Sequence, residues 1–119
     1  MSSQESTSIE VRDDAILVTP TCTELDDEHA DEMEDMVSAA SAETQNLPVI
    51  LDLSRVEQVA DDSLGVLVDL LNECKKRTQR LILVGLRPAV LEILSVTSLG
   101  KLFEYREDVD DALVHLREV

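Results

Sequence analysis

Residues 48–86 read PVILDLSRVEQVADDSLGVLVDLLNECKKRTQRLILVGL. The apolar runs at 48–53 and 80–86 are near-continuous, as is typical of strands buried on both faces of a sheet. Between them, residues 63–78 predict a helix, because one stripe at helical spacing is apolar: Leu64, Leu67, Val68, Leu71 and Cys74. Buried strands that alternate with helices run parallel and need right-handed crossovers. This stretch therefore predicts an α/β fold.

The residues that precede this stretch predict an antiparallel hairpin. Alternating or apolar runs at 9–12 and 15–19 flank Asp13–Asp14, a pair that tolerates the conformation of a turn. Residues 1–8 form a polar, Ser-rich leader that we expect to fray. A chain of 119 residues is long enough for one core but not for two, so we expect a single domain over 9–119.

Helices and one more strand complete the expected order. Apolar residues at helical spacing predict helices over 25–44 and 108–117, and Pro88 opens a short helix that runs to Val96. Residues 102–105 predict a short strand. The order is β-β-α-β-α-β-α-β-α, which predicts a mostly parallel central sheet with an antiparallel edge strand and about four helices.

The chain is strongly acidic, with a formal net charge of −16. Eight of the twelve residues in 24–35 are acidic, and Phe103 and Tyr105 are the only aromatic residues. Phosphate backbones and anionic membrane surfaces repel such a chain, and it lacks aromatic platforms on which bases stack. We therefore expect no nucleic-acid partner and no membrane insertion. A basic protein surface would be favoured as a partner, although the same charge also serves solubility.

No catalytic or metal-binding pattern is visible. Cys22 and Cys74 are far apart and fit no metal or redox spacing, so we expect reduced thiols in a cytoplasmic protein. His29 and His115 are isolated, and we take them as residues of helix surfaces. The three glycines are also isolated, so no phosphate-binding loop is present. We expect neither an enzyme nor a cofactor or metal.

The segment after the first buried strand carries the densest group of polar side chains. Asp61, Asp62 and Ser63 lie together at the start of a helix, where such side chains cap free N–H groups. A metal-chelating phosphoacceptor site like that of a response regulator is an alternative. It would need an Asp at the end of a strand and a Lys after a later strand. We expect Asp52 to lie inside its strand, and no Lys follows the second buried strand directly.

Five collinear segments, spanning residues 9–112, resemble the STAS domain and more narrowly the bacterial anti-sigma factor antagonists. They are VTPTCTELDDEHADEM, PVILDLS, VADDSLGVLVDLL, LILVGL and RPAVLEILSVTSLGKLFEYREDVDDAL. The resemblance implies a domain that binds an anti-sigma factor, which is also an ATP-dependent serine kinase, and thereby controls transcription. It also implies that phosphorylation of a Ser or Thr at the start of the second helix abolishes this binding, because the phosphate brings about −1.5 to −2 charges to the interface.

This sequence departs from the family motif, which is approximately Asp-Ser-Ser/Thr-Gly-Leu-Gly. A gapless match anchored on Leu64–Gly65 puts Ala60 at the motif Asp, Asp61 at the first Ser and Asp62 at the phosphoacceptor. A match with a one-residue deletion makes Ser63 the phosphoacceptor instead. The first register predicts a fixed negative charge at the switch, and the second predicts a phosphorylation site.

The resemblance also indicates a surface for the partner, in which the residues of the second helix face solvent by periodicity. It comprises Asp26, Asp61, Asp62, Ser63, Asp69, Asn72 and Lys76. Two other functions stay open: a scaffold subunit of a signalling or lipid-transport complex, and a nucleotide-binding domain, against which the carboxylates at this helix start argue. For the chain itself we expect a monomer or a weak homo-oligomer.

Overall fold

A computed structural model describes residues 7–117 of the chain. It opens with a hairpin of β1 (Thr7–Val11) and β2 (Ile16–Pro20), which pair antiparallel with Ile9 opposite Val18. The hairpin is confirmed, and its turn is closed by the amide of Arg12, which donates to the carbonyl of Ala15 at 2.8 Å. The first strand begins two residues before the expected position, so Thr7 and Ser8 belong to the sheet and not to the polar leader. The remainder of that leader lies outside the described residues.

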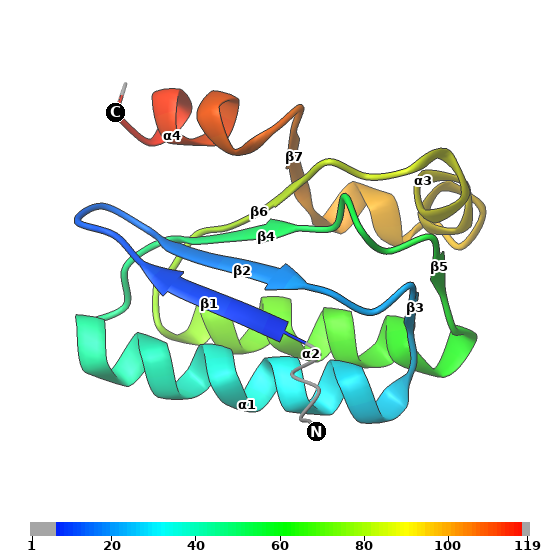
Figure 1. Ribbon diagram of the computed structural model, residues 1–119, viewed down its shortest axis with the longest axis horizontal. Coiled ribbons are helices and arrows are strands. Elements are labelled where there is room, and N and C mark those ends of the chain that lie inside the picture. The colour runs from blue at the N-terminus through cyan, green and yellow to red at the C-terminus, as the bar shows by residue number, and fades with distance from the viewer. Residues whose placement is uncertain (1–6, 118–119) are drawn as a thin grey trace.

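Three parallel strands extend the hairpin into a five-stranded sheet (Figure 1). They are β4 (Val49–Asp52), β6 (Leu81–Val84) and β7 (Glu104–Arg106), and the order across the sheet is β1-β2-β4-β6-β7. Among residues 7–117 only β1 and β2 pair antiparallel, so the predicted mostly parallel sheet with an antiparallel edge is confirmed.

The described part of the chain has four α-helices, which follow the strands in the predicted order: α1 (Asp27–Thr44), α2 (Asp61–Lys76), α3 (Pro88–Val96) and α4 (Val109–Arg117). Helices α1 and α2 lie side by side on one face of the sheet, and α4 covers the opposite face (Figure 1). A short 3-10 helix, η1 (Leu99–Leu102), precedes β7. The last strand therefore begins at Glu104 and not at Leu102 as predicted, because Leu102 is part of that turn.

A two-stranded sheet was not predicted. Strands β3 (Glu24–Leu25) and β5 (Gln58–Val59) pair in parallel, with Leu25 opposite Val59. The amide of Ala60 also donates to the carbonyl of Leu25 at 3.0 Å. Two residues are too few to show the alternation by which a strand is recognised in a sequence. This pair joins the loop before α1 to the loop before α2.

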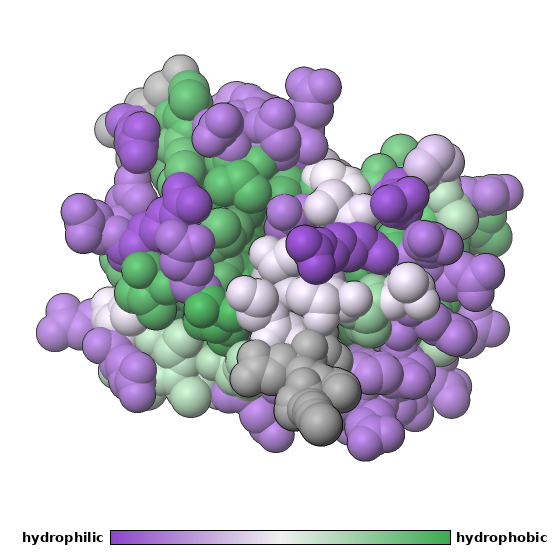
Figure 2. All heavy atoms as spheres, viewed as in Figure 1, coloured by the Kyte–Doolittle hydropathy of each residue, from purple (hydrophilic) through white to green (hydrophobic). Residues whose placement is uncertain are grey.

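The hydrophobic core has two layers separated by the sheet. The larger layer packs α1, α2 and α3 on one face, and the smaller packs α4 over Ala15, Ile50 and Ile82 on the other. One core assignment is corrected: Val68 is half-buried, whereas Leu70 is fully buried. Figure 2 shows a strip of hydrophobic surface between α4 and the hairpin.

Candidate functional site

The N-terminal ends of α1 and α2 form one acidic surface. Both helices follow parallel strands of the same sheet, so their N-termini lie at the same end of the molecule (Figure 1). The β3–β5 pair fixes the loops that lead into them. Acidic residues in the first turns, Asp27 and Glu28 of α1 and Asp61 and Asp62 of α2, face the positive ends of both helix dipoles.

Asp26 caps α1. Its Oδ1 accepts the amide hydrogen of His29 at 3.0 Å and lies 2.6 Å from Nδ1 of the same histidine. The His29 amide, followed by the imidazole contacts, lowers the pKa of Asp26 below its usual value. The carboxylate stays half-exposed, with 48% of its side chain accessible, so it is available to a partner.

The start of α2 differs from the capped start that the sequence suggested. Ala60 occupies the N-cap and no side chain caps the helix, so the predicted capping role of the polar group is wrong. Asp61 and Asp62 lie in the first turn and are exposed. Ser63 is fully buried, with 0% exposure, and its Oγ has no hydrogen-bond partner among the described residues. The three adjacent residues thus have two different environments.

The acids of the two helices act on one another electrostatically. Burial and then the charge of Asp62 raise the pKa of Asp27. Burial and then the charge of Asp69 raise the pKa of Glu34, further along the same pair of helices. Neighbouring like charges destabilise one another's ionised forms, and a cationic partner would reduce this repulsion.

The remaining residues of the predicted surface extend along α2. Asp69, Asn72 and Lys76 are all exposed, and Lys76 donates to Glu73 at 3.3 Å. From Asp61 to Lys76 the helix rises about 22 Å. The structure therefore brings together Asp26, Asp61 and Asp62 at one end, places Lys76 at the other, and excludes the side chain of Ser63 from the exposed face.

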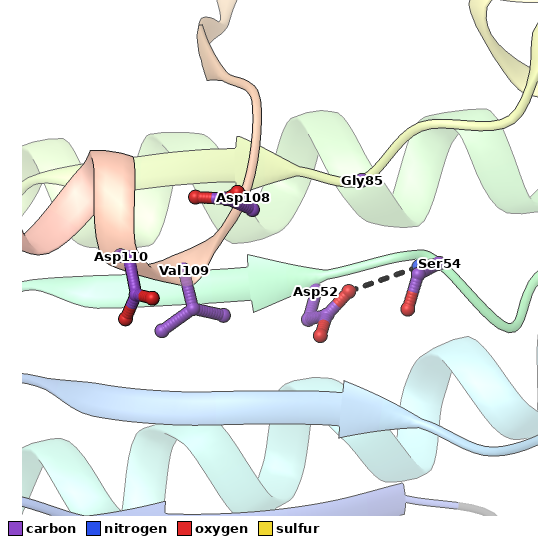
Figure 3. Close-up of a pocket in the computed structure, with 6 residues that line it drawn as sticks. All are labelled: Asp52, Ser54, Gly85, Asp108, Val109 and Asp110. Carbon is purple, nitrogen blue, oxygen red and sulfur yellow. Dashed lines mark hydrogen bonds between the residues drawn. The ribbon is translucent and has the colours of Figure 1, made fainter.

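A second feature escaped the sequence analysis: a cavity of about 260 Å³ at the ends of β4 and β6 (Figure 3). It is lined by Asp52, Ser54, Gly85, Asp108, Val109 and Asp110. Asp52 is the last residue of β4 and does not lie inside the strand as expected, and its Oδ1 accepts the amide hydrogen of Ser54 at 3.0 Å. No lysine lines the cavity. Of the residues that line the cavity, Asp52 was the one weighed as a possible site residue from the sequence, and Asp108 and Asp110 are far away from it in sequence.

The described residues hold no arrangement for metal chemistry. Within residues 7–117, no three His, Cys, Asp or Glu side chains are placed to bind one metal ion. Cys22 and Cys74 are both free, and burial raises the pKa of each thiol. No helix in the described part of the chain is long and apolar enough to span a bilayer.

The described residues form an α/β fold whose mostly parallel sheet has an antiparallel edge pair, with an acidic surface at the starts of two paired helices. The family model of the STAS domain matches residues 6–112, and the chain belongs to this family.

Solved structures agree with this assignment. A candidate anti-sigma factor antagonist from Thermotoga maritima is 26% identical, with a TM-score of 0.82 and coverage of 93% of this chain and 94% of that one. An anti-sigma factor antagonist from Mycobacterium paratuberculosis is 28% identical, with a TM-score of 0.77 and coverage of 93% and 92%. The fold is also that of SpoIIAA from Bacillus in its phosphorylated form, at 15% identity, a TM-score of 0.68 and coverage of 92% and 96%.

Proposed function

We propose that this chain is a regulatory interaction subunit that binds an anti-sigma factor of the ATPase-type serine kinase class and thereby controls transcription in a bacterial cytoplasm. The observation that carries the proposal is the continuous exposed acidic surface at the paired starts of α1 and α2. This surface includes the segment at which the family's phosphorylation switch lies. Two of the similar structures are themselves described as anti-sigma factor antagonists.

Within this proposal, Asp62 occupies the switch position and the chain is not regulated by phosphorylation there. Asp62 is exposed in the first turn of α2, as a switch residue must be. Ser63 is fully buried, so a kinase could reach its hydroxyl only if the first turn of α2 opened. An aspartate supplies one negative charge against about −1.5 to −2 for a phosphate and lacks its three oxygens. Asp62 would therefore prevent switching without reproducing the phosphorylated state.

Affinity capture followed by reconstitution tests this function. The wild-type chain and Asp62→Ser should both capture a serine kinase of the ATPase type from the source cell, identified by mass spectrometry. With that purified kinase, ATP should release Asp62→Ser and leave the wild type bound. Asp110→Ser is the matched control, because Asp110 is an exposed acid in the first turn of a helix on the opposite face of the sheet.

Two results would contradict these proposals separately. Failure of the wild type to capture any kinase of this type would refute the proposed function. Release of the wild type by ATP, with phosphate mapped to Ser63, would leave the function intact and refute the role of Asp62.

A further inference from the structure

The strand β7 lies at the edge of the five-stranded sheet, opposite the hairpin. It pairs with β6 on one side, with Tyr105 opposite Leu83, and no strand among residues 7–117 pairs on its other side. The carbonyl of Glu107 accepts the amide hydrogen of Gly85 at 3.1 Å. The Val84 carbonyl accepts the amide hydrogen of Leu53, which follows β4, so the backbone groups of Leu83 face β7. In this parallel pair the backbone groups of Glu104 and Arg106 therefore face β6, and those of Tyr105 face outwards, where the Tyr105 carbonyl accepts from Arg106 Nη1 of the same chain at 3.1 Å. These outward groups are the kind that another strand can pair with.

We infer that a second copy of this chain docks antiparallel on β7, so that the two sheets join across a two-fold axis at Tyr105. Such an interface presents the same patch from both copies. In this register Glu104 of each copy lies opposite Arg106 of the other, and opposite charges on facing residues stabilise a strand pair. A slide of the register by two residues in either direction, the smallest that keeps each side chain on its face of the sheet, would place Glu104 or Arg106 opposite itself. The charge pattern of the strand therefore selects the register centred on Tyr105.

Two chains of net charge −16 repel one another, and cations near β7 reduce this repulsion at the edge strand. Glu104 contacts the guanidinium groups of both Arg80 and Arg106, and the side chains of Glu104 and Arg106 are each 31% exposed. Lys101 adds an exposed cation just before the strand. Local charge is thus nearly balanced here, in contrast to the acidic surface of α1 and α2.

Apolar surface flanks the edge strand. Two cavities of about 250 Å³ each lie beside β7, and Leu91 and Tyr105 line both of them. Leu91 is 47% exposed and Leu102 is 45% exposed. In the proposed pair, Tyr105 faces Tyr105 of the second copy, and this groove between α3 and β7 is partly covered. Because the strand has only three residues, we expect a weak dimer whose interface lies at the small end of specific protein interfaces.

Charge reversal tests this interface in a way that does not involve the kinase-docking surface. Sedimentation velocity should show the wild type shifting with concentration from 13.2 kDa to twice that mass. Arg106→Glu alone and Glu104→Arg alone should each remain monomeric, because each places like charges opposite one another. An equimolar mixture of the two variants should dimerise again, since every facing pair is then of opposite charge. Arg12→Glu, an equal charge change at the opposite edge of the sheet, should dimerise as the wild type does.

A cross-linking measurement covers the case in which Glu104→Arg fails to fold after losing its contact with Arg80. In a Cys22→Ser background, Tyr105→Cys should form an intermolecular disulfide on oxidation, because facing residues of such a pair lie within disulfide distance. Glu92→Cys, on exposed α3, should not. A wild type that stays monomeric at several hundred micromolar would overturn the inference. A dimer that is indifferent to Arg106→Glu would overturn it too.

Discussion

Replacement of Ser63 by alanine should stabilise the protein. The side chain of Ser63 is fully buried and its hydroxyl has no hydrogen-bond partner among the described residues. Burial of an unpaired hydroxyl costs about 1–3 kcal/mol in proteins. Alanine also has a higher helix propensity, by about 0.5 kcal/mol. The cavity left by one oxygen atom offsets part of this gain, so we expect the free energy of unfolding to rise by about 1–2 kcal/mol.

Thermal unfolding followed by circular dichroism would measure this change, as a rise in Tm of roughly 4–8 °C for a domain of this size. Ser38→Ala is the matched control, because Ser38 is an exposed serine inside α1 and reports helix propensity alone. Ser63→Ala should exceed that control clearly. If it destabilised the protein instead, the hydroxyl would have a partner, and the argument from its burial would fail. Kinase binding by Ser63→Ala should equal that of the wild type.

Three further predictions concern other parts of the chain. Gln79→Leu should lower the free energy of unfolding in urea by about 2–3 kcal/mol, because the buried Gln79 amide donates to Ser41 Oγ at 2.8 Å; an unchanged midpoint would contradict this. Gly85→Ala should destabilise by at least about 1 kcal/mol, because Gly85 has a φ of 69° and an added Cβ would meet neighbouring atoms at 3.0 Å. Gly65→Ala, in open space within α2, should instead raise Tm. Burial and neighbouring carboxylates raise the pKa of Asp27, so its charge opposes folding above that pKa and protonation relieves this as pH falls. Asp27→Asn should therefore raise Tm at about pH 7, and equal melting temperatures there would refute the reasoning, whereas the difference should vanish near pH 3.

Hydrophobic periodicity was enough to predict the fold. The apolar runs of β4 and β6 predict buried strands, and apolar residues at helical spacing predict the helices that follow them. The β3–β5 pair could not be predicted, because it depends on two loops that meet only after the helices have packed on the sheet. The cavity at Asp52 could not be predicted for the same reason, since Asp108 and Asp110 reach it from the far end of the chain.

The burial of Ser63 was within reach of the sequence. Ser63 precedes Leu67, Leu70 and Cys74 at spacings of four, three and four residues, and all four are buried on one face of α2. Because Ser63 is a polar residue in the first turn, it was interpreted as a cap. Its place on the buried face of α2 was therefore missed. The acids Asp61 and Asp62, which are out of that phase, face solvent as expected.

The β3–β5 pair has a consequence for binding. Because Leu25 and Val59 are both buried and joined in one small sheet, the loops ahead of α1 and α2 are held in place before any partner arrives. A partner that contacts both helix starts then has little backbone freedom left to remove, which lowers the entropic cost of association. The same tie links the two helices mechanically, so that displacement of one helix start would be felt at the other.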